Sequence, residues 1–336
     1  MNDKNPSGAS YPELLTVSPS PHIRHSDTTR SVMTDVIIAL VPALIWGVIC
    51  FGPRAALVVI LSVASCVLSE YVFEKITHRK VTIGDCSAAV TGLLLGLSLS
   101  SSVPYYMPVV GGVFAIVVAK QLFGGIGKNF MNPALAARVF LFAWPSEMNK
   151  FVKPFSRLSL FASGADVDTV ATATPLVSLK TGALPDVSMT ELILGEVGGC
   201  IGEVSVVLLL LGAAYLLCRR VISWHIPVSY IGVVALLTVL FPRNADTGSF
   251  VLSQLFSGGL VLGAFFMATD YSTSPITNKG KLIFGALCGA LTVLIRYFGG
   301  YPEGVSFAIL IANSLVYYID RVTLPRVFGK GGAANG

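Results

Sequence analysis

The sequence has few charged residues for its length. Only 12% of its 336 residues are Asp, Glu, Lys or Arg, whereas a soluble domain usually has about 25%. Hydrophobic residues make up 54% and occur in blocks of membrane-spanning length. The sequence also has no basic run or aromatic-interleaved basic stripe, which argues against a nucleic-acid partner. These features predict a membrane protein whose main surroundings are the lipid bilayer.

Motifs for metals, nucleotides and export are missing as well. The six cysteines occur singly and never as CxxC, so we expect neither a zinc site nor an iron–sulfur cluster held by this chain alone. The four histidines lack metal-ligand spacing, and no metal ligand is predicted. No Walker motif or G-x-G-x-x-G after a strand is present, so NAD is not expected to bind this chain. The polar first thirty residues argue against a cleaved signal peptide.

About ten apolar segments follow that polar start. Several are shorter than the roughly 20 residues that a spanning helix needs, and the third and eighth contain glycine interruptions. This pattern predicts an all-α, polytopic membrane protein with some broken helices. The segments are 34–51, 55–74, 86–101, 105–123, 132–146, 199–218, 224–241, 250–269, 281–298 and 304–319.

The two halves of the apolar region resemble each other. Gly92-Leu-Leu-Leu-Gly96 matches Gly259-Leu-Val-Leu-Gly263, and Lys120-Gln-Leu-Phe-Gly-Gly125 matches Ile295-Arg-Tyr-Phe-Gly-Gly300. Because each half has an odd number of spans, a tandem duplication would place the halves in opposite orientations. We therefore expect two inverted five-helix repeats, whose breaks usually mark a site near the bilayer midplane.

Lys and Arg residues fall unevenly on the two sides of this topology. One side collects about twice as many as the other, which predicts that both termini are cytoplasmic. The predicted organisation is a cytoplasmic N-terminal arm (1–30), a first five-helix repeat (31–146), an outside loop (147–198), a second five-helix repeat (199–320) and a cytoplasmic tail (321–336).

The outside loop contains Asp168-Thr-Val-Ala-Thr-Ala-Thr174-Pro175. Taken by itself, this is a Thr-rich turn before a proline and is typical of a polar loop. A loop of about fifty residues without strong periodicity is usually functional or disordered. The residues alone leave both interpretations open.

Along nearly its whole length the sequence resembles the D subunit of Rnf electron-transport complexes. It is more distantly similar to the B subunit of sodium-pumping NADH:quinone oxidoreductases. Five blocks in the same order carry the resemblance. They are Ser20-Pro-His-Ile-Arg24; Phe123-Gly-Gly-Ile-Gly-Lys-Asn129 with Asn132-Pro-Ala-Leu135; Gly199-Cys-Ile-Gly-Glu-Val-Ser205; Phe265-Phe-Met-Ala-Thr-Asp270 with Ser274-Pro275; and Tyr301-Pro-Glu-Gly304 with Phe307-Ala-Ile-Leu310.

The resemblance implies a covalently bound cofactor. In that family a loop of the pattern Asp-x-x-Ser-Gly-Ala-Thr carries FMN, joined by a phosphoester to the last threonine. Here the pattern falls on Asp168, Ala171, Thr172, Ala173 and Thr174, so Ala and Thr replace the Ser and the Gly. Thr174 is the expected attachment residue, Thr172 is its competitor, and Asp168 belongs to the motif that the flavin transferase reads. A second, non-covalent flavin such as riboflavin is also implied, at a position that no residue specifies.

The function implied by the resemblance is that of a flavoprotein subunit in the bacterial inner membrane. It would relay electrons through FMN within an Rnf-type ferredoxin:NAD+ oxidoreductase and couple them to Na+ or H+ translocation. We expect it to be inactive alone and to have no catalytic residue of its own. Expected partners are the iron–sulfur and flavin subunits of the complex and a flavin transferase. Two alternatives stay open: the B subunit of a quinone-reducing sodium pump, and a solute channel or transporter with no redox role.

Charged residues within the apolar segments are costly and often mark ion paths. Glu203 and Asp270 are candidates for such a path. Arg138 could hold a flavin phosphate, but pairing with a carboxylate is the preferred interpretation. Asp35 and Glu70 are expected to be interfacial or intersubunit groups.

Overall fold

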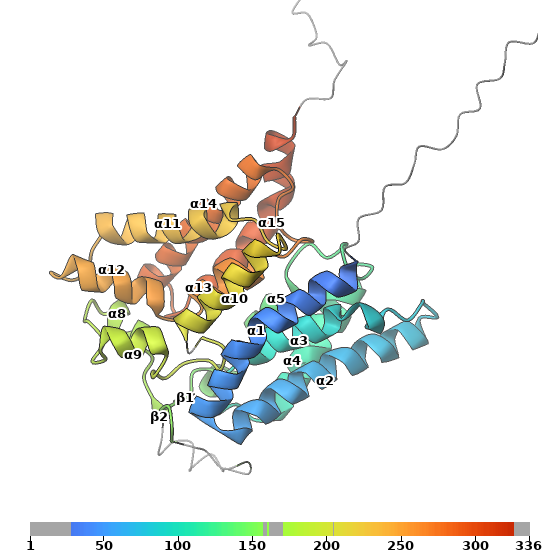
Figure 1. Ribbon diagram of the computed structural model, residues 1–336, viewed down its shortest axis with the longest axis horizontal. Helices are drawn as coiled ribbons and strands as arrows, with labels where there is room; N and C mark the ends of the chain where they lie inside the picture. The colour runs from blue at the N-terminus through green and yellow to red at the C-terminus, as the bar shows by residue number, and fades with distance from the viewer. Residues whose placement is uncertain (1–27, 157–159, 161–170, 204, 326–336) are drawn as a thin grey trace, which may run out of the picture.

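The computed structural model describes residues 28–156, 160, 171–203 and 205–325. This part of the chain is a helical bundle with one small two-stranded sheet (Figure 1). The predicted helical class is confirmed. The two strands belong to the loop between the halves, outside the helical bundle.

The first half contains two long helices followed by shorter ones. Its α5 begins where the sequence predicts, because the side chain of Asn132 accepts hydrogen bonds from the backbone N–H groups of Ala134 and Leu135, and Pro133 fits the first helical turn. The elements are α1 (Thr29–Phe51), α2 (Pro53–Ile76), the 3-10 turn η1 (Ile83–Asp85), α3 (Ser87–Leu97), α4 (Tyr106–Val113), the π-helix η2 (Phe114–Gln121) and α5 (Pro133–Leu141).

The connection between the halves folds over one end of the bundle. Strands β1 and β2 pair antiparallel, with Phe151 opposite Thr172 and Val152 opposite Ala171. The elements of this connection are α6 (Pro145–Met148), β1 (Phe151–Val152), β2 (Ala171–Thr172), α8 (Pro175–Lys180) and α9 (Met189–Leu194).

The second half repeats the pattern of helices, but only its third segment is broken, whereas α3 of the first half runs unbroken through Gly92 and Gly96. Helix α12 ends at Phe256, and the chain resumes as α13 after Gly258 and Gly259. The elements are α10 (Val206–Cys218), α11 (His225–Leu240), α12 (Thr247–Phe256), α13 (Leu260–Leu262), the π-helix η3 (Gly263–Met267), α14 (Asn278–Phe298) and α15 (Val305–Thr323).

Four of the described helices are long and apolar enough to cross a membrane: α1, α2, α14 and α15. A fifth span is formed if α12 and the segment Leu260–Met267, which are bent by 57° at the break, are counted together. Helices α3, α10, α11 and the continuous pair α4–η2 are apolar but shorter. The structure therefore supports a multi-pass membrane protein, whereas the count of ten spans is not confirmed.

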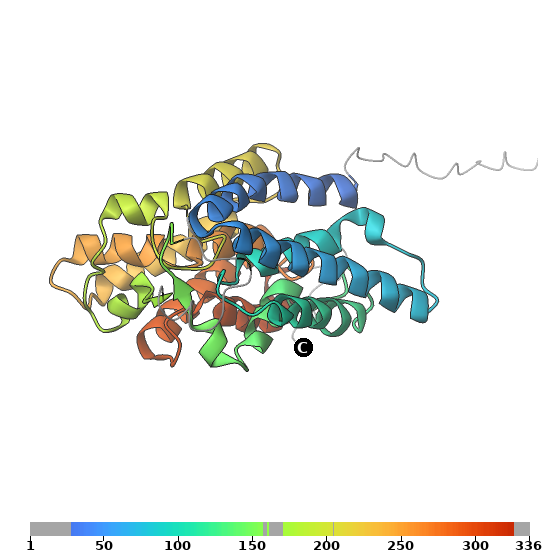
Figure 2. The ribbon, with the colours of Figure 1, turned by 90° about the horizontal axis from the view of Figure 1, so that it is seen from below.

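Helices at equivalent places in the two halves lie against each other. The first helices, α1 and α10, are in contact and lie side by side in Figures 1 and 2, and the last helices, α5 and α15, are in contact as well. Within each half the second helix packs on the fourth, as α2 on α4–η2 and α11 on α14. A two-fold relation between the halves would give this arrangement, and the inverted orientation stays a prediction.

The packing of α11 on α14 depends on small residues. A Cβ atom on Gly285 of α14 would lie 2.6 Å from the carbonyl oxygen of Ile226, and one on Gly289 would lie 2.8 Å from that of Tyr230. Both distances are shorter than a van der Waals contact. Glycines spaced four residues apart therefore let α14 approach the backbone of α11, as is usual between membrane helices.

Candidate functional site

The predicted attachment residue, Thr174, occupies the N-cap position of α8. Its backbone is extended (φ −76°, ψ 152°), and its side chain makes no capping hydrogen bond. Pro175 occupies the first helical position, and the Thr174 hydroxyl makes no bond to the backbone N–H groups of the residues after it, unlike Asn132 at the start of α5. Thr174 is half-buried and lines two neighbouring cavities. Asp168 lies outside the described residues.

We call the more open of these spaces the outer cavity. It has a volume of about 440 Å³, within the range of about 300–1,000 Å³ that is usual for cofactor sites. Lys153, Thr172 and Thr174 contribute to its wall. The methyl group of Thr172 packs against Gly198, where a Cβ atom would lie 2.3 Å from it. Of the two candidate threonines, only Thr174 also lines the second space.

The second space, the inner cavity, lies between Thr174 and the ends of α5 and α12. Aromatic side chains form part of its wall: the rings of Phe142 and Tyr301 have centroids 4.9 Å apart, and Tyr301 stacks on Phe307. Charged groups form another part of the wall. The inner cavity therefore offers both a flat apolar surface and a polar one.

The polar part is formed by four residues, Arg138, Cys200, Glu203 and Glu303, which we call the charge cluster. The guanidinium of Arg138, on α5, donates to Oε1 of Glu203 at 3.3 Å, to Oε2 of Glu303, and to Sγ of Cys200 at 3.3 Å. The side chains of Arg138, Glu203 and Glu303 are 4%, 6% and 13% exposed. Arg138 is thus paired with carboxylates, as the sequence favoured.

The break between α12 and α13 makes room for the cluster. A Cβ atom on Gly259 would lie 2.6 Å from Oε1 of Glu203 and 2.8 Å from Oε1 of Glu303. Next to the break, Arg296 of α14 is 2% exposed and donates to the carbonyl oxygens of Gln254 and Ser257. The guanidinium thus provides hydrogen-bond donors for carbonyl groups that have no helical partner at the end of α12.

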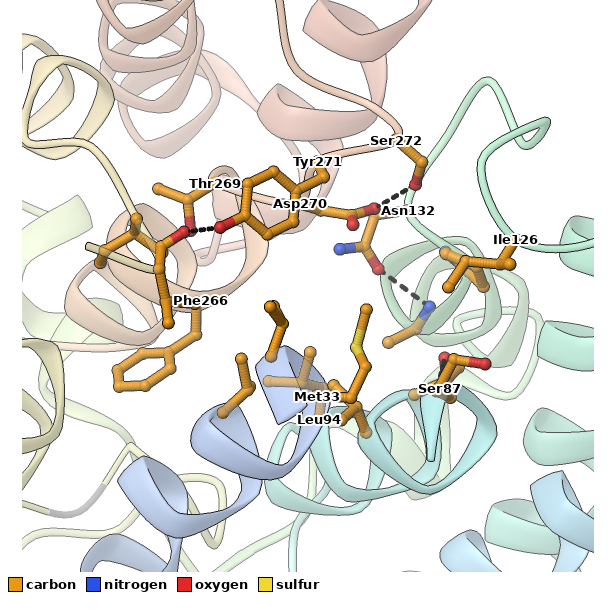
Figure 3. Close-up of a pocket in the computed structure, with 18 of the residues that line it drawn as sticks. Met33, Ser87, Leu94, Ile126, Asn132, Phe266, Thr269, Asp270, Tyr271 and Ser272 are labelled. Atoms are coloured by element: carbon orange, nitrogen blue, oxygen red, sulfur yellow. Dashed lines mark hydrogen bonds between the residues drawn. The ribbon is translucent and has the colours of Figure 1, made fainter. Parts of the chain in front are cut away.

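A third space, the Asp270 pocket, lies near the N-terminal ends of α3 and α5, whereas the inner cavity lies near their C-terminal ends. Figure 3 shows Asp270, Tyr271 and Ser272 on one side of it, with Met33 and Leu94 on another. The carboxylate of Asp270 accepts hydrogen bonds from the hydroxyls of Ser272 at 2.9 Å and Thr273 at 3.1 Å. The pocket thus joins a hydrogen-bonded carboxylate to an apolar wall.

Both π-helices end at the Asp270 pocket. Phe266 of η3 lines it directly, and Lys120 of η2 reaches it from the other side. The Lys120 ammonium donates to Oε1 of Glu70 at 2.6 Å and to the hydroxyl of Ser87 at 2.6 Å. Single π-helical turns within membrane helices frequently occur at functional sites.

Two carboxylates that were expected to be interfacial or intersubunit groups pair within the chain. Glu70 is fully buried inside the first half and paired with Lys120, so it needs no partner from another subunit. Asp35 pairs within the chain, with Arg219 at 3.1 Å and with the Tyr215 hydroxyl at 2.8 Å, so it does not need another subunit as partner. These pairings were not predicted, because the partners are distant in sequence and become neighbours only when the helices pack.

The two candidate ion-path residues lie in different cavities. Glu203 faces the inner cavity, and Asp270 faces the pocket at the other end of α3 and α5. Glu303 and Cys200 complete the charge cluster but were not selected from the sequence. Glu303 precedes the last apolar segment, and the cysteine was interpreted as an ordinary small buried residue. Both residues lie within sequence blocks that carry the family resemblance, and this was the available sequence signal for a functional role.

Comparisons with known proteins agree with this description. The family model described as NQR2, RnfD, RnfE family matches residues 16–329. The D subunit of the Na(+)-translocating ferredoxin:NAD(+) oxidoreductase complex of Acetobacterium woodii is 45% identical over 94% of this chain and 95% of its own length. The proton-translocating counterpart of Clostridium ljungdahlii is 43% identical over 94% and 96%. The D subunit of the ion-translocating oxidoreductase complex of Shewanella amazonensis is 38% identical over 94% and 99%. The chain therefore belongs to the NQR2, RnfD, RnfE family and, within it, to the D subunits of Rnf complexes.

Proposed function

We propose that this chain is the electron-relaying D subunit of an Rnf-type ferredoxin:NAD+ oxidoreductase and that it holds FMN through Thr174. FMN, when bound, supplies one- and two-electron transfer. The observation that carries the proposal is the position of Thr174: its side chain makes no capping bond to α8 and lies where the outer and inner cavities meet. Relatives with 45% and 43% identity bear names of such complexes.

The residues around Thr174 fit the two parts of FMN. Lys153 lines the outer cavity and brings a positive charge that suits a phosphate, beside the acidic residues Asp186 and Glu196. In the inner cavity, Arg138 likewise faces two carboxylates. Phe142 and Tyr301 offer flat surfaces there for an aromatic ring. The described lining residues give each cavity one cation and two carboxylates, so charge does not choose between them. The outer cavity, at about 440 Å³ against about 40 Å³ for the inner one, is the space that supports a flavin next to Thr174.

The Asp270 pocket has a lining of the kind that cofactor sites have. Phe266 and Leu94 provide apolar surface, while Asn132 and Thr269 provide polar groups at its edge (Figure 3). Its volume of about 80 Å³ is well below the roughly 300 Å³ of a cofactor site, so our proposal gives the second, non-covalent flavin no place in this pocket.

The arrangement of the chain supports the proposed orientation. In Figure 1 the start of α1 and the end of α15 lie on the side of the bundle away from the β1–β2 pair, which is at the bottom. Termini on the cytoplasmic side and the FMN loop outside would give this picture. In this proposal the membrane is the bacterial inner membrane, and a flavin transferase attaches FMN to Thr174. The iron–sulfur and flavin subunits of the complex deliver and remove electrons, and this electron transfer drives Na+ or H+ across the membrane.

The B subunit of a quinone-reducing sodium pump is the second candidate function, because the family that matches includes NQR2. Both candidates share the flavin loop. They differ in electron donor, which is ferredoxin in one case and NADH in the other. Reduction of the assembled complex by each donor separates them.

The flavin linkage is tested by co-expressing the chain with a flavin transferase and denaturing the product. We expect in-gel flavin fluorescence and a matching intact-mass increment in the wild type and in Thr172→Ala, and neither in Thr174→Ala. Loss of the label in Thr172→Ala alone would move the site to Thr172. No label in any sample, with a transferase shown to be active on another substrate, would refute the flavoprotein function.

A further inference from the structure

The charge cluster contains more negative than positive groups. One side-chain atom from each of Cys200, Glu203 and Glu303 lies within 4.8 Å of the others, and Arg138 is the only cation among the described residues that pairs with either carboxylate. With both carboxylates ionised, the cluster has one negative charge in excess. An uncompensated charge at this burial is costly and favours binding of a cation or a proton.

Two hydrogen-bonding atoms of the cluster are buried without a partner. They are Oε1 of Glu303 and Nε of Arg138. Oε1 of Glu303 and Oε1 of Glu203 both point to the space left by the missing side chain of Gly259. A proton on one of these oxygens gives the other a donor, and it removes the excess charge at the same time. Paired carboxyl groups that share a proton behave in this way.

A second cation, Arg296, offsets part of this negative charge from outside the cluster. Arg296 acts on both carboxylates electrostatically, but its guanidinium is bonded to carbonyl oxygens at the end of α12. The remaining neighbours are neutral acids, and α3, α8 and α12 contribute only uncharged side chains to the inner cavity. The titratable neighbours are Cys200 before α10, Tyr230 of α11 and Tyr301 before α15.

We propose that Glu203 and Glu303 form a carboxyl pair that binds one proton when the redox group in the adjoining cavity is reduced. The proposal rests on the proposed attachment of FMN at Thr174, which lines the same inner cavity as both carboxylates. Added negative charge in this cavity raises the affinity of the pair for a proton, because the like charges lie in a poorly hydrated space. The pair thus links electron arrival to proton uptake.

The exchange balances in charge and atoms. Reduced iron–sulfur carriers of the complex supply two electrons to the flavin, and they are oxidised in turn. One proton binds the flavin and a second, from water outside the membrane, binds a carboxylate oxygen of the pair as an O–H. No bond of the chain breaks. When the electrons leave, both protons are released.

The test is a redox titration of the Thr174-linked flavin in the assembled complex, followed by its absorbance over a pH series around neutrality. An additional proton per two electrons changes the midpoint potential by about 30 mV more for each tenfold change in proton activity. We expect Glu203→Gln and Glu303→Gln to lose this additional slope. Glu147→Gln, which removes a carboxylate from α6 outside both cavities, should keep it.

The outcomes separate this inference from the proposed function. Flavin retained in all variants with the same slope in each would refute the proton-binding pair and leave the flavoprotein function intact. A potential that responds to Na+ at constant ionic strength but not to pH would also refute it. Absence of covalent flavin in the wild type would instead refute the proposed function. Retained in-gel fluorescence shows that a glutamine variant has folded and been loaded.

Discussion

The buried pair of Lys120 and Glu70 gives a quantitative prediction for the first half of the bundle. Their side chains are 4% and 1% exposed and lie 2.6 Å apart. Lys120→Met keeps most of the apolar stem but leaves Glu70 without its cation. Removing one partner of a buried pair costs about 3–5 kcal/mol. Gln121 still donates to the same Glu70 oxygen at 2.8 Å, so we expect the lower end, about 3 kcal/mol.

Thermal unfolding of the purified protein in detergent measures this loss. At about 2 °C per kcal/mol for a chain of this size, Lys120→Met should lower Tm by about 6 °C. Adding Glu70→Gln should restore most of it, because no buried charge then remains at the pair. The control is Lys75→Met, on the exposed side of α2, the helix that carries Glu70. It should change the free energy of unfolding by less than about 0.5 kcal/mol.

The relative Tm values of these variants test whether the Lys120–Glu70 pair stabilises the first half. If Lys120→Met is as stable as Lys75→Met, the buried pair does not hold the first half together and the reasoning is wrong. If the double variant is no more stable than Lys120→Met, the loss comes from the lysine stem or from its bond to the Ser87 hydroxyl. It would then not come from an unpaired carboxylate.

Two further variants test other parts of the structure. Gly259→Ala should displace both carboxylates of the charge cluster, because its Cβ would lie 2.6 and 2.8 Å from their oxygens. We expect the free energy of unfolding to fall by about 1–3 kcal/mol, measured as a lower Tm. An unchanged Tm would contradict this steric crowding. Hydrogen bonds from Ser249 lower the pKa of Asp246 at the start of α12. Its contribution is therefore present above the unfolded-state pKa and lost as the pH falls through the lower folded-state value. Asp246→Ala should be less stable than the wild type at neutral pH and equally stable in acid, and a pH-independent difference would exclude this cause.

Local features of the sequence determined much of the architecture. Apolar blocks identified a polytopic membrane protein, because the lipid interior accepts helices whose backbone groups are paired internally. Asn132-Pro133 predicted the start of α5, and the glycines at 258 and 259 predicted the break in the eighth segment. These features act within a few residues of chain, so they can be recognised without knowing what packs against them. The order of the five blocks then indicated the family.

Only the tertiary structure decided which charged groups meet. Arg138 and Glu303 are 165 residues apart, and Lys120 and Glu70 are 50 apart, yet each pair is in direct contact. Such pairing depends on how helices from separate parts of the chain pack, so hydrophobic periodicity carries no information about it. The same packing buried Glu70 and brought Glu303 from a loop beside Glu203. Composition and motifs were thus sufficient for the class and the family, while the charge cluster next to Thr174 exists only because the two halves fold against each other.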